Sequence, residues 1–219
     1  MIKLSSRLTA IAELVPNDAK LIDVGCDHAF LDIYLVEHHK GLKHVASDNK
    51  QGPLEKARIN LEQYGMVDEV ILQLSEGLTK VDEDIDTAII AGMGGRNIIG
   101  ILKQGNLNHI NTLILSPNND VSLVREYICK NYYFENEVLV EDGKYIYPIM
   151  LLKKGKRYCS KKELYFGPVL ISDQNKLFYE YYGRSIRQKE LLLKLLPKNY
   201  IYKKYLVKKE LKLLKSVVK

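Results

Sequence analysis

The stretch LIDVGCDHAF, residues 21–30, predicts a short buried strand, a tight turn and the start of a helix. Asp23 lies in the strand, and Gly25 follows it where doubly wound α/β folds let the backbone approach a ligand closely. The stretch departs from G-x-G-x-x-G, because Asp27 and Phe30 replace the later glycines. A dinucleotide pyrophosphate requires those glycines and a helix N-terminus without negative charge. The acid at residue 27 therefore favours a cofactor that lacks phosphate and carries positive charge.

The regions around this stretch alternate between strand-like and helix-like patterns. Apolar runs occur at 21–25, 44–48, 69–74, 85–91 and 112–116, and amphipathic stretches at 28–40, 52–64, 95–104 and 120–131. Ser5 and Ser6 predict the start of an additional helix before them. This alternation indicates βαβ units and a parallel sheet. Two further runs, 133–141 and 145–152, surround Asp142-Gly143 and predict an antiparallel hairpin.

A parallel sheet that finishes in an antiparallel hairpin is the architecture of class I S-adenosylmethionine (SAM)-dependent methyltransferases, although hairpin edges occur in other α/β folds too. SAM also lacks phosphate and carries a positive charge at sulfur, as the turn at residues 25–30 favours. Composition fits such an enzyme, since 46% of the 219 residues are hydrophobic and 27% are charged.

The composition also excludes several classes of protein. No apolar run approaches the roughly 18 residues of a transmembrane helix, and the N-terminus has no cleavage pattern, so we expect neither membrane association nor a signal peptide. Cys26, Cys129 and Cys159 are far apart and form no CxxC pair. They favour a reducing cytoplasm over disulfides, and we predict no metal site.

Charge is distributed unevenly along the chain. Residues 1–152 contain 14 Lys or Arg against 22 Asp or Glu, a net charge of −8. Residues 153–219 contain 19 against 5, a net charge of +14. A basic segment attached to an acidic body favours a polyanionic partner. The alternative is a solvated pair of basic helices in a lysine-rich protein.

The basic segment predicts two long helices separated by Pro197. Their apolar spacing is that of an antiparallel hairpin with coiled-coil-like packing, and the expected seam is Phe178, Tyr182, Ile186, Leu193 and Leu196 against Tyr202, Leu206, Leu213 and Val217. We therefore predict a SAM-binding domain at 1–157 and a basic helical domain at 158–219.

Polar residues and glycines follow each strand at the predicted ligand-binding edge. Asp48 lies 23 residues after Gly25, close to the spacing of about 20 at which an acid holds ribose hydroxyls. Ser75-Glu76-Gly77 can place an acceptor near an adenine, or form an ordinary turn. Ala91-Gly92-Met93-Gly94-Gly95 indicates a close backbone approach to a ligand. Asn118 offers both a donor and an acceptor for a base edge.

Taken in order, the segments SSRL, DVGCDHAFL, ASDNKQGP, EGL, IAGMGG and SPN resemble the bacterial tRNA (adenine-22 N1)-methyltransferase (TrmK) family. The resemblance runs to about residue 152 and continues more loosely through FGP at 166–168 and the helical hairpin. It implies a Rossmann-like, mostly parallel seven-stranded sheet with a C-terminal coiled coil. It also implies methyl transfer from SAM to N1 of an adenosine in tRNA.

The resemblance assigns roles to individual positions. It implies cofactor contacts for Gly25, His28, Asp48, Glu76, Gly77, Gly92, Met93 and Gly94, and we predict further contacts from the adjacent Asp23, Cys26 and Asn49. It implies substrate binding for Arg7, whereas an arginine in a first helical turn is otherwise expected to be solvated. Two positions depart from the family: Ser116 replaces a frequent Gln, and Asp32 replaces a usual Pro, a change expected to be peripheral.

Asp27 is the predicted catalytic residue, together with Arg7 and Asn118 at the substrate. Neutral adenine N1 has an in-plane lone pair, so its attack on the methyl group needs no base. Positive charge then develops on the purine, and a carboxylate at the N6 amino group stabilises it. The alternatives for Asp27 are a helix N-cap or a contact with the SAM methionyl amine. His28 is expected to form structural hydrogen bonds.

Three rival functions stay open at this point. A different adenine methyltransferase is one, although the Asp/Asn-Pro-Pro-aromatic motif of N6 enzymes is replaced here by AGMGG. A nicotinamide-dependent dehydrogenase is disfavoured by the missing glycines. A non-catalytic RNA-binding protein is the third. We expect tRNA as the partner, no obligatory protein partner and a cytoplasmic location.

Overall fold

A computed structural model describes residues 2–218 of the chain, which divide into two compact units, Met1–Val169 and Leu170–Lys219. The sequence places a boundary after residue 157, before α6 (Lys161–Phe166). This helix packs against α5 (Val121–Ile128), so it belongs to the first unit. The first unit therefore extends twelve residues beyond the predicted boundary.

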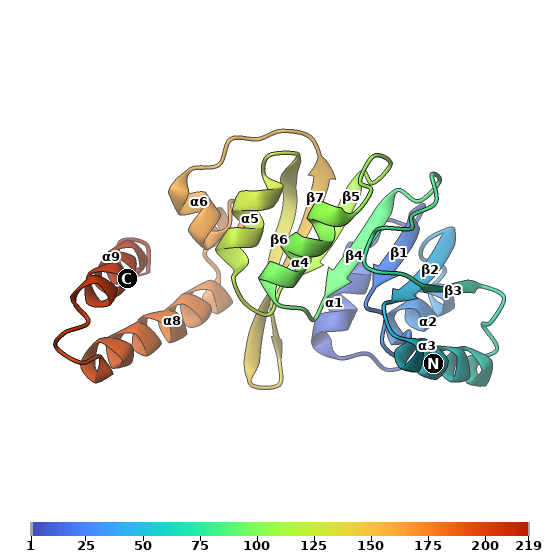
Figure 1. The fold of residues 1–219 in the computed structure, drawn as a ribbon, viewed down its shortest axis with the longest axis horizontal. Helices are drawn as coiled ribbons and strands as arrows, with labels where there is room; N and C mark the ends of the chain where they lie inside the picture. The colour runs from blue at the N-terminus through green and yellow to red at the C-terminus, as the bar shows by residue number, and fades with distance from the viewer. Residues whose placement is uncertain (1, 219) are drawn as a thin grey trace. The chain divides into compact units, whose positions relative to one another are not determined.

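The first unit is built on one seven-stranded sheet (Figure 1). Its strands are β1 (Lys20–Val24), β2 (Lys43–Asp48), β3 (Val70–Leu74), β4 (Thr87–Ala91), β5 (Thr112–Ser116), β6 (Tyr132–Asp142) and β7 (Tyr145–Lys154). The spatial order is β3-β2-β1-β4-β5-β7-β6, with β1 to β5 parallel and β7 antiparallel to both neighbours. The predicted parallel sheet and terminal hairpin are confirmed.

Helices cover both faces of this sheet. On one face, α4 (Gly95–Gln104), α5 and α6 contribute Ile98, Val124 and Leu164 to a core with the strands. On the other face, α1 (Ser6–Leu14) and α2 (Phe30–Glu37) pack Ile11 and Leu35 onto the sheet, and α3 (Gln51–Tyr64) packs beside them. Because the central strands are covered on both sides, they are continuous apolar runs.

The buried ion pair between Arg125 and Glu137 joins α5 to β6. Nε of Arg125 donates to Oε1 of Glu137 at 2.9 Å, and both side chains are at most 1% exposed. Arg125 also donates to the carbonyl of Tyr165, and Glu137 accepts from the backbone N–H of Val169. The pair thereby fixes the segment that leads out of the first unit.

The second unit consists of the short helix α7 (Leu170–Asp173) and an antiparallel hairpin, α8 (Lys176–Leu195) and α9 (Ile201–Lys215). Ion pairs join Lys189 to Glu210 and Lys215 to Glu190. The predicted seam is partly wrong. Tyr202 and Leu206 are exposed, whereas the buried residues of α9 are Val207, Leu211 and Leu214.

Candidate active site

The candidate site lies at the carboxyl ends of β1 and β4, adjacent strands at which the strand order reverses. Gly25 follows β1 and Gly92 follows β4, with Val24 paired to Ile90 in register. In open α/β sheets, ligands bind in the crevice at this topological switch point. Two cavities occur here, one on each side of the Gly25 turn.

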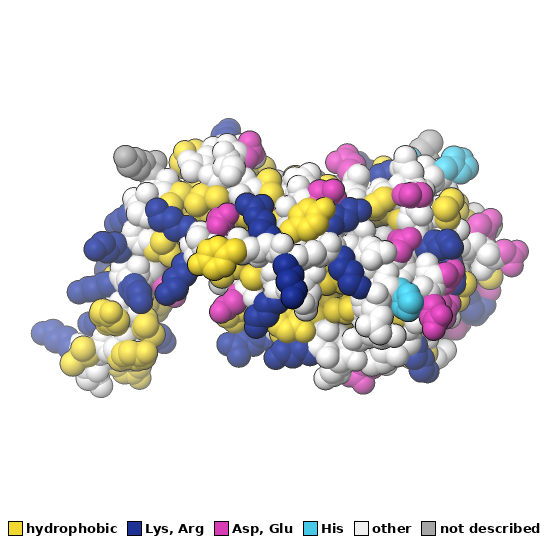
Figure 2. All heavy atoms as spheres, turned by 90° about the horizontal axis from the view of Figure 1, so that it is seen from above, with side chains coloured by type: hydrophobic (Ala, Val, Ile, Leu, Met, Phe, Trp, Pro, Cys, Tyr) yellow, Lys and Arg dark blue, Asp and Glu magenta, His cyan; other side chains and the backbone are white. Residues whose placement is uncertain are grey.

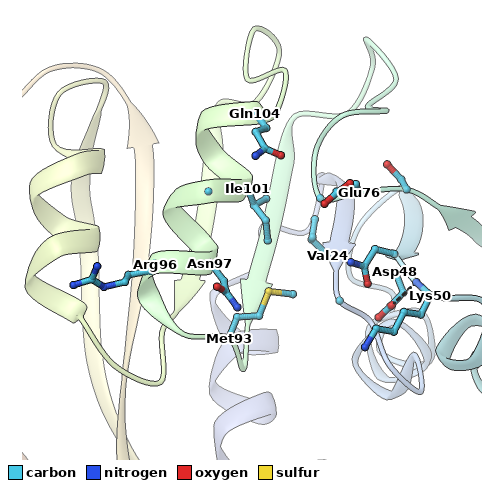
Figure 3. Close-up of a pocket in the computed structure, with 14 residues that line it drawn as sticks. Val24, Asp48, Lys50, Glu76, Met93, Arg96, Asn97, Ile101 and Gln104 are labelled. Atoms are coloured by element: carbon cyan, nitrogen blue, oxygen red, sulfur yellow. Dashed lines mark hydrogen bonds between the residues drawn. The ribbon is translucent and has the colours of Figure 1, made fainter.

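The first cavity has a volume of about 450 Å³ and lies between α4 and the ends of β2 and β3 (Figure 3). Asn97, Ile101 and Gln104 reach it from α4, opposite Asp48 and Glu76 (Figure 3). The other lining residues are Val24, Gly25, Asn49, Lys50, Ser75, Gly77, Met93, Arg96 and Gly100. Carboxylates opposite an apolar wall suit a nucleoside, whose hydroxyls and amino group donate and whose base packs.

Two features of the first cavity fix its shape. Oδ1 of Asp48 accepts a hydrogen bond from the backbone N–H of Lys50 at 3.0 Å. This bond orients the carboxylate, and Oδ2 can accept from a ligand. A Cβ at Gly77, whose φ is +55°, would lie 2.8 Å from Ile101. Gly77 is therefore required both by its left-handed backbone and by the helix beside it.

The second cavity has a volume of about 280 Å³ and lies between α1, the Gly25 turn and the end of β4. Asp27 and His28 of the turn and Phe30 of α2 line it, together with Arg7 of α1 and Gly92 after β4. Its remaining lining residues are Ser5, Leu8, Asp23, Gly25, Cys26, Leu31, Ala91 and Asp142. The His28 and Phe30 rings stack with centroids 5.3 Å apart. This wall offers an aromatic surface and a carboxylate to a flat ligand.

Asp27 adopts a left-handed backbone, with φ of +50°, although it has a Cβ. Such strain persists where the surrounding structure enforces it, and it clusters at functional sites. The N-cap of α2 is Ala29, and no side chain caps that helix, so the N-cap alternative for Asp27 is wrong. The carboxylate is 64% exposed and lies 3.4 Å from Nε2 of His28.

Acidic side chains are concentrated beneath the Gly25 turn. Burial, reinforced by the charge of Asp48, raises the pKa of Asp23 to about 7. Burial also raises the pKa of Asp32 well above its usual value, with a smaller contribution from Asp23. Burial and the surrounding carboxylates raise the pKa of the Cys26 thiol, which makes it a poor nucleophile. A cationic ligand would relieve this repulsion.

Asp32 is not peripheral, contrary to the expectation from the sequence. Its side chain is fully buried in the first turn of α2, and neither carboxylate oxygen has a hydrogen-bond partner among the described residues. A buried acid without a partner costs free energy in its charged form, so the protein favours the protonated carboxyl here.

Arg7 is buried instead of solvated. Its Nε donates to Oγ of Ser116 at 2.9 Å, its Nη1 donates to Oδ1 of Asn118 at 2.8 Å, and its Nη2 donates to the Ser116 carbonyl. The guanidinium carbon lies 4.0 Å from the centroid of the Tyr147 ring. The arginine lines the second cavity, but its guanidinium fork is directed at the protein.

The two cavities bring together most of the residues predicted from the sequence. Gly94 and Asn118 line neither cavity. Gly94 is the N-cap of α4, whereas Asn118 donates from Nδ2 to the Gly92 carbonyl, which belongs to the cavity wall. Sequence reasoning missed Lys50, Arg96, Asn97, Ile101 and Gln104 in the first cavity, and Phe30 and Asp142 in the second. The spacing of Asn97, Ile101 and Gln104, directly after the glycine loop, was the available signal.

Comparisons with known proteins identify the family of the chain. A family model described as tRNA (adenine(22)-N(1))-methyltransferase, TrmK, matches residues 21–216. The tRNA (adenine(22)-N(1))-methyltransferase of Bacillus subtilis is 32% identical over 197 residues, covering 85% of this chain and 82% of that protein.

Solved structures with the same fold include one complex with S-adenosyl-L-methionine and one with S-adenosyl-homocysteine. A putative tRNA (m1A22) methyltransferase of Streptococcus pneumoniae in complex with S-adenosyl-L-methionine has a TM-score of 0.91 at 28% identity, covering 99% of this chain and all of that one. Mycoplasma capricolum TrmK with S-adenosyl-homocysteine has a TM-score of 0.88 at 28% identity, covering 99% of each chain.

The family, fold class and SAM dependence inferred from the sequence are thereby confirmed. No helix within the described residues is long and apolar enough to cross a membrane. The chain belongs to the TrmK family of SAM-dependent tRNA (adenine(22)-N(1))-methyltransferases.

Proposed function

We propose that Asp27 accelerates methylation of adenine N1 by accepting a hydrogen bond from the N6 amino group of the target base. One observation carries this assignment. Asp27 presents a largely exposed carboxylate to the second cavity, from a strained turn, without capping the helix that follows. Adenine N1 attacks through its lone pair, so the purine gains positive charge as the N1–C bond forms. A fixed carboxylate beside N6 stabilises that charge most strongly in the transition state.

The residues of the two cavities fit SAM, which supplies an electrophilic methyl group on a positively charged sulfur. In this proposal, Asp48 holds the ribose hydroxyls, and Glu76, beside Ser75, accepts from the cofactor adenine. Asp23 beneath Gly25, when ionised, attracts the methionyl amine and the sulfonium. Gly25 lines both cavities, so its backbone lies where the nucleoside meets the methionyl portion.

Asp27 has no proton to remove before attack, because N1 of neutral adenine is unprotonated. The sulfur–methyl bond breaks as the N1–methyl bond forms, so the positive charge passes from sulfur to the purine. His28 and Phe30 form the stacked wall beside Asp27, and the target base can pack on it. Because N1 lies on the Watson–Crick edge, the base must be unpaired or flipped when it enters.

We propose that the second unit holds the tRNA backbone. Residues 170–219 contain 13 Lys or Arg and four Asp or Glu, and Figure 2 shows blue basic side chains over the hairpin. Tyr200, Tyr202 and Tyr205 are exposed between these cations. Alternating rings and cations suit a sequence-tolerant RNA surface. A tRNA substrate also implies that the enzyme acts in the cytoplasm.

The decisive experiment incubates the protein with labelled SAM and unmodified tRNA that has A22, then identifies the nucleosides by mass spectrometry. Wild type should form N1-methyladenosine. Asp27→Asn and Asp27→Ala should lower kcat by ~10²-fold while SAM binding persists. N6-methyladenosine as the product, or undiminished kcat in Asp27→Ala, contradicts the proposal.

Asp120→Asn is a matched control for Asp27. Asp120 also has a left-handed backbone, with φ of +50°, and also precedes a helix. It lines neither cavity and instead pairs with Arg96 at 3.4 Å. Because Arg96 lines the first cavity, the comparison is made at saturating SAM. There the substitution should leave kcat unchanged, which separates the role of the carboxylate from a general effect of strained acidic turns.

A further inference from the structure

We propose that Arg7 is a positioning residue that fixes the side-chain amide of Asn118, so that Asn118 presents an N–H donor to a ring nitrogen of the target adenine, N7 or N3. The inference rests on the proposed function, because it assumes adenine as substrate and Asp27 as the acceptor from N6. It assigns Arg7 to the protein's own architecture in place of a contact with tRNA phosphate.

The first step is that the Arg7 side chain is bound by the protein itself. Arg7 lies in the first turn of α1, where a long cationic side chain normally reaches solvent, yet it is only 9% exposed. Each of its three guanidinium nitrogens donates to Ser116 or Asn118, and its face packs on Tyr147. Three of the five guanidinium N–H groups thus bind protein acceptors, which sets the geometry of the side chain, and a lysine cannot reproduce it.

The second step is the orientation of the amide. Oδ1 of Asn118 faces Nη1 of Arg7, which can only donate, and Nδ2 faces the Gly92 carbonyl at 2.5 Å, which can only accept. Reversing the amide would oppose donor to donor and acceptor to acceptor. The pair of contacts therefore admits one orientation, and the second N–H of Nδ2 is the donor that the amide has left for a ligand.

The third step places this donor next to the wall of the substrate cavity. Asn118 itself lines neither cavity, but its Nδ2 contacts the carbonyl of Gly92, which lines the second one. The backbone N–H of Asn118 donates to the Met93 carbonyl at 2.8 Å, so the residue is fastened to the glycine loop after β4. Gly92 of that loop, Arg7 and Asp27 all line the second cavity. The site thus offers one acceptor and one donor, which matches the N6 amino group of adenine and an unreacted ring nitrogen.

The fourth step predicts which kinetic constant changes. A hydrogen bond from an N–H to N7 or N3 weakens in the transition state, because the purine becomes positive and its ring nitrogens become poorer acceptors. The contact therefore stabilises the bound substrate at least as much as the transition state, and its loss raises KM for tRNA with little change in kcat. Asp27 has the opposite signature, because its variants lower kcat.

The test compares Asn118→Asp, Arg7→Lys and their combination in steady-state assays with wild-type tRNA. Asn118→Asp keeps the acceptor for Arg7 and removes both N–H donors of Nδ2, the one to the Gly92 carbonyl as well as the one left for the ligand. The deaza analogues described below separate these two losses. Each single variant should raise KM roughly three- to tenfold, as expected for one hydrogen bond, and the double variant should be no worse than either. Additive losses, or a normal KM in both single variants, overturn the proposal.

A structural control is Ser116→Ala, which removes a hydroxyl that bonds Arg7 and the Pro148 carbonyl but leaves the Asn118 contact in place. This variant should lower the thermal stability of the protein and change KM for tRNA little. If the Arg7 variants fail to fold, tRNA carrying 7-deazaadenosine or 3-deazaadenosine at the target position still tests the donor. One analogue should raise the wild-type KM as much as Asn118→Asp does and add nothing in that variant.

Failure of this inference is distinguishable from failure of the proposed function. If the wild-type enzyme forms no N1-methyladenosine, the proposed function itself is wrong. If the wild-type enzyme forms N1-methyladenosine and its KM is the same for both deaza analogues as for adenosine, only the donor role of Asn118 is wrong.

Discussion

A Cβ on Gly25 would lie 2.3 Å from Cε of Met93, across the point where the two cavities meet. The φ of Gly25 is +80°, so an L side chain would be strained as well as crowded. Met93 lines the first cavity, so a shift of its flexible end would change the wall of that cavity. We therefore expect Gly25→Ala to weaken SAM binding at least ~10-fold while the protein stays folded.

Isothermal titration calorimetry with SAM measures this effect directly. Gly52→Ala is the control, because Gly52 lies in α3 with no atom within 4 Å of an added Cβ. That variant should bind SAM normally. Equal affinities for Gly25→Ala and wild type would show that the close approach at Gly25 serves the fold alone.

The strands and most helices could be predicted because the sequence pattern of each is compatible with only one type of secondary structure. β1, β4 and β5 are buried on both faces, so each is an unbroken apolar run between turn residues. α3 also ends at Tyr64, before Gly65, whose left-handed backbone closes the helix as expected. Local chemistry determines these elements, and it is visible in the sequence.

The hairpin seam could not be predicted, because α9 has apolar residues on more than one face. Tyr202 and Leu206 satisfy helical spacing as well as Val207, Leu211 and Leu214 do, and packing selects the second set. The contact of Arg7 with Asn118 spans 111 positions, so no local pattern indicates it. Burial of Asp32 is likewise a tertiary effect, since an acid in a first helical turn is ordinarily a solvated one.

SAM affinity should depend on pH through Asp23. Its pKa of about 7 means that the carboxyl is largely protonated below pH 7 and ionised above it. A cationic ligand favours the ionised form, so binding should weaken as pH falls, by roughly fivefold from pH 7 to pH 6 for a single group with this pKa. Calorimetry at both pH values checks this, and Asp23→Asn should bind weakly with no such dependence. An equal pH dependence in the variant would assign it to another group.

Stability should fall with rising pH because of Asp32. Its folded pKa is raised above the unfolded value of about 3.9, so the native state retains a proton that the unfolded chain releases. Unfolding free energy therefore decreases from pH 4 up to the folded pKa. Asp32→Leu should raise stability at pH 8 by about 1 kcal/mol or more, and much less at pH 4.

Urea unfolding of wild type, Asp32→Leu and Asp32→Asn at both pH values measures this. The asparagine variant separates loss of charge from gain of apolar contact, because it keeps the shape of the aspartate. A destabilised Asp32→Leu at pH 8 would mean that the carboxylate has a favourable partner in solution.

Breaking the Arg125–Glu137 pair should destabilise the first unit. Both side chains are buried, so Glu137→Gln leaves a charged guanidinium facing a neutral amide, and the expected loss is about 3 kcal/mol. Urea unfolding followed by circular dichroism measures the loss. Arg58→Ala, which removes an exposed arginine paired with Glu55 and Glu62 on α3, should cause no measurable change.

Affinity for tRNA should fall steeply with salt if the basic hairpin binds phosphates. Each phosphate neutralised by a cation releases counterions, so the logarithm of the binding constant declines linearly with the logarithm of salt concentration. Replacing the exposed Lys203, Lys208 and Lys209 of α9 by Gln should reduce the slope by about one for each phosphate that these lysines neutralise in the wild-type complex. Filter binding between 50 and 200 mM salt, a range of roughly fourfold, resolves such a change.

Lys56→Gln provides the comparison, since Lys56 is an exposed lysine of α3 in the acidic first unit. Its replacement should leave the slope unchanged. A flat slope for wild type would show that the hairpin does not bind the phosphate backbone. An equal reduction per substituted lysine in Lys56→Gln and in the α9 variant would show that net charge alone, and not the hairpin, governs affinity. Only a reduction specific to α9 assigns phosphate binding to the second unit, because net charge changes identically per lysine in either place.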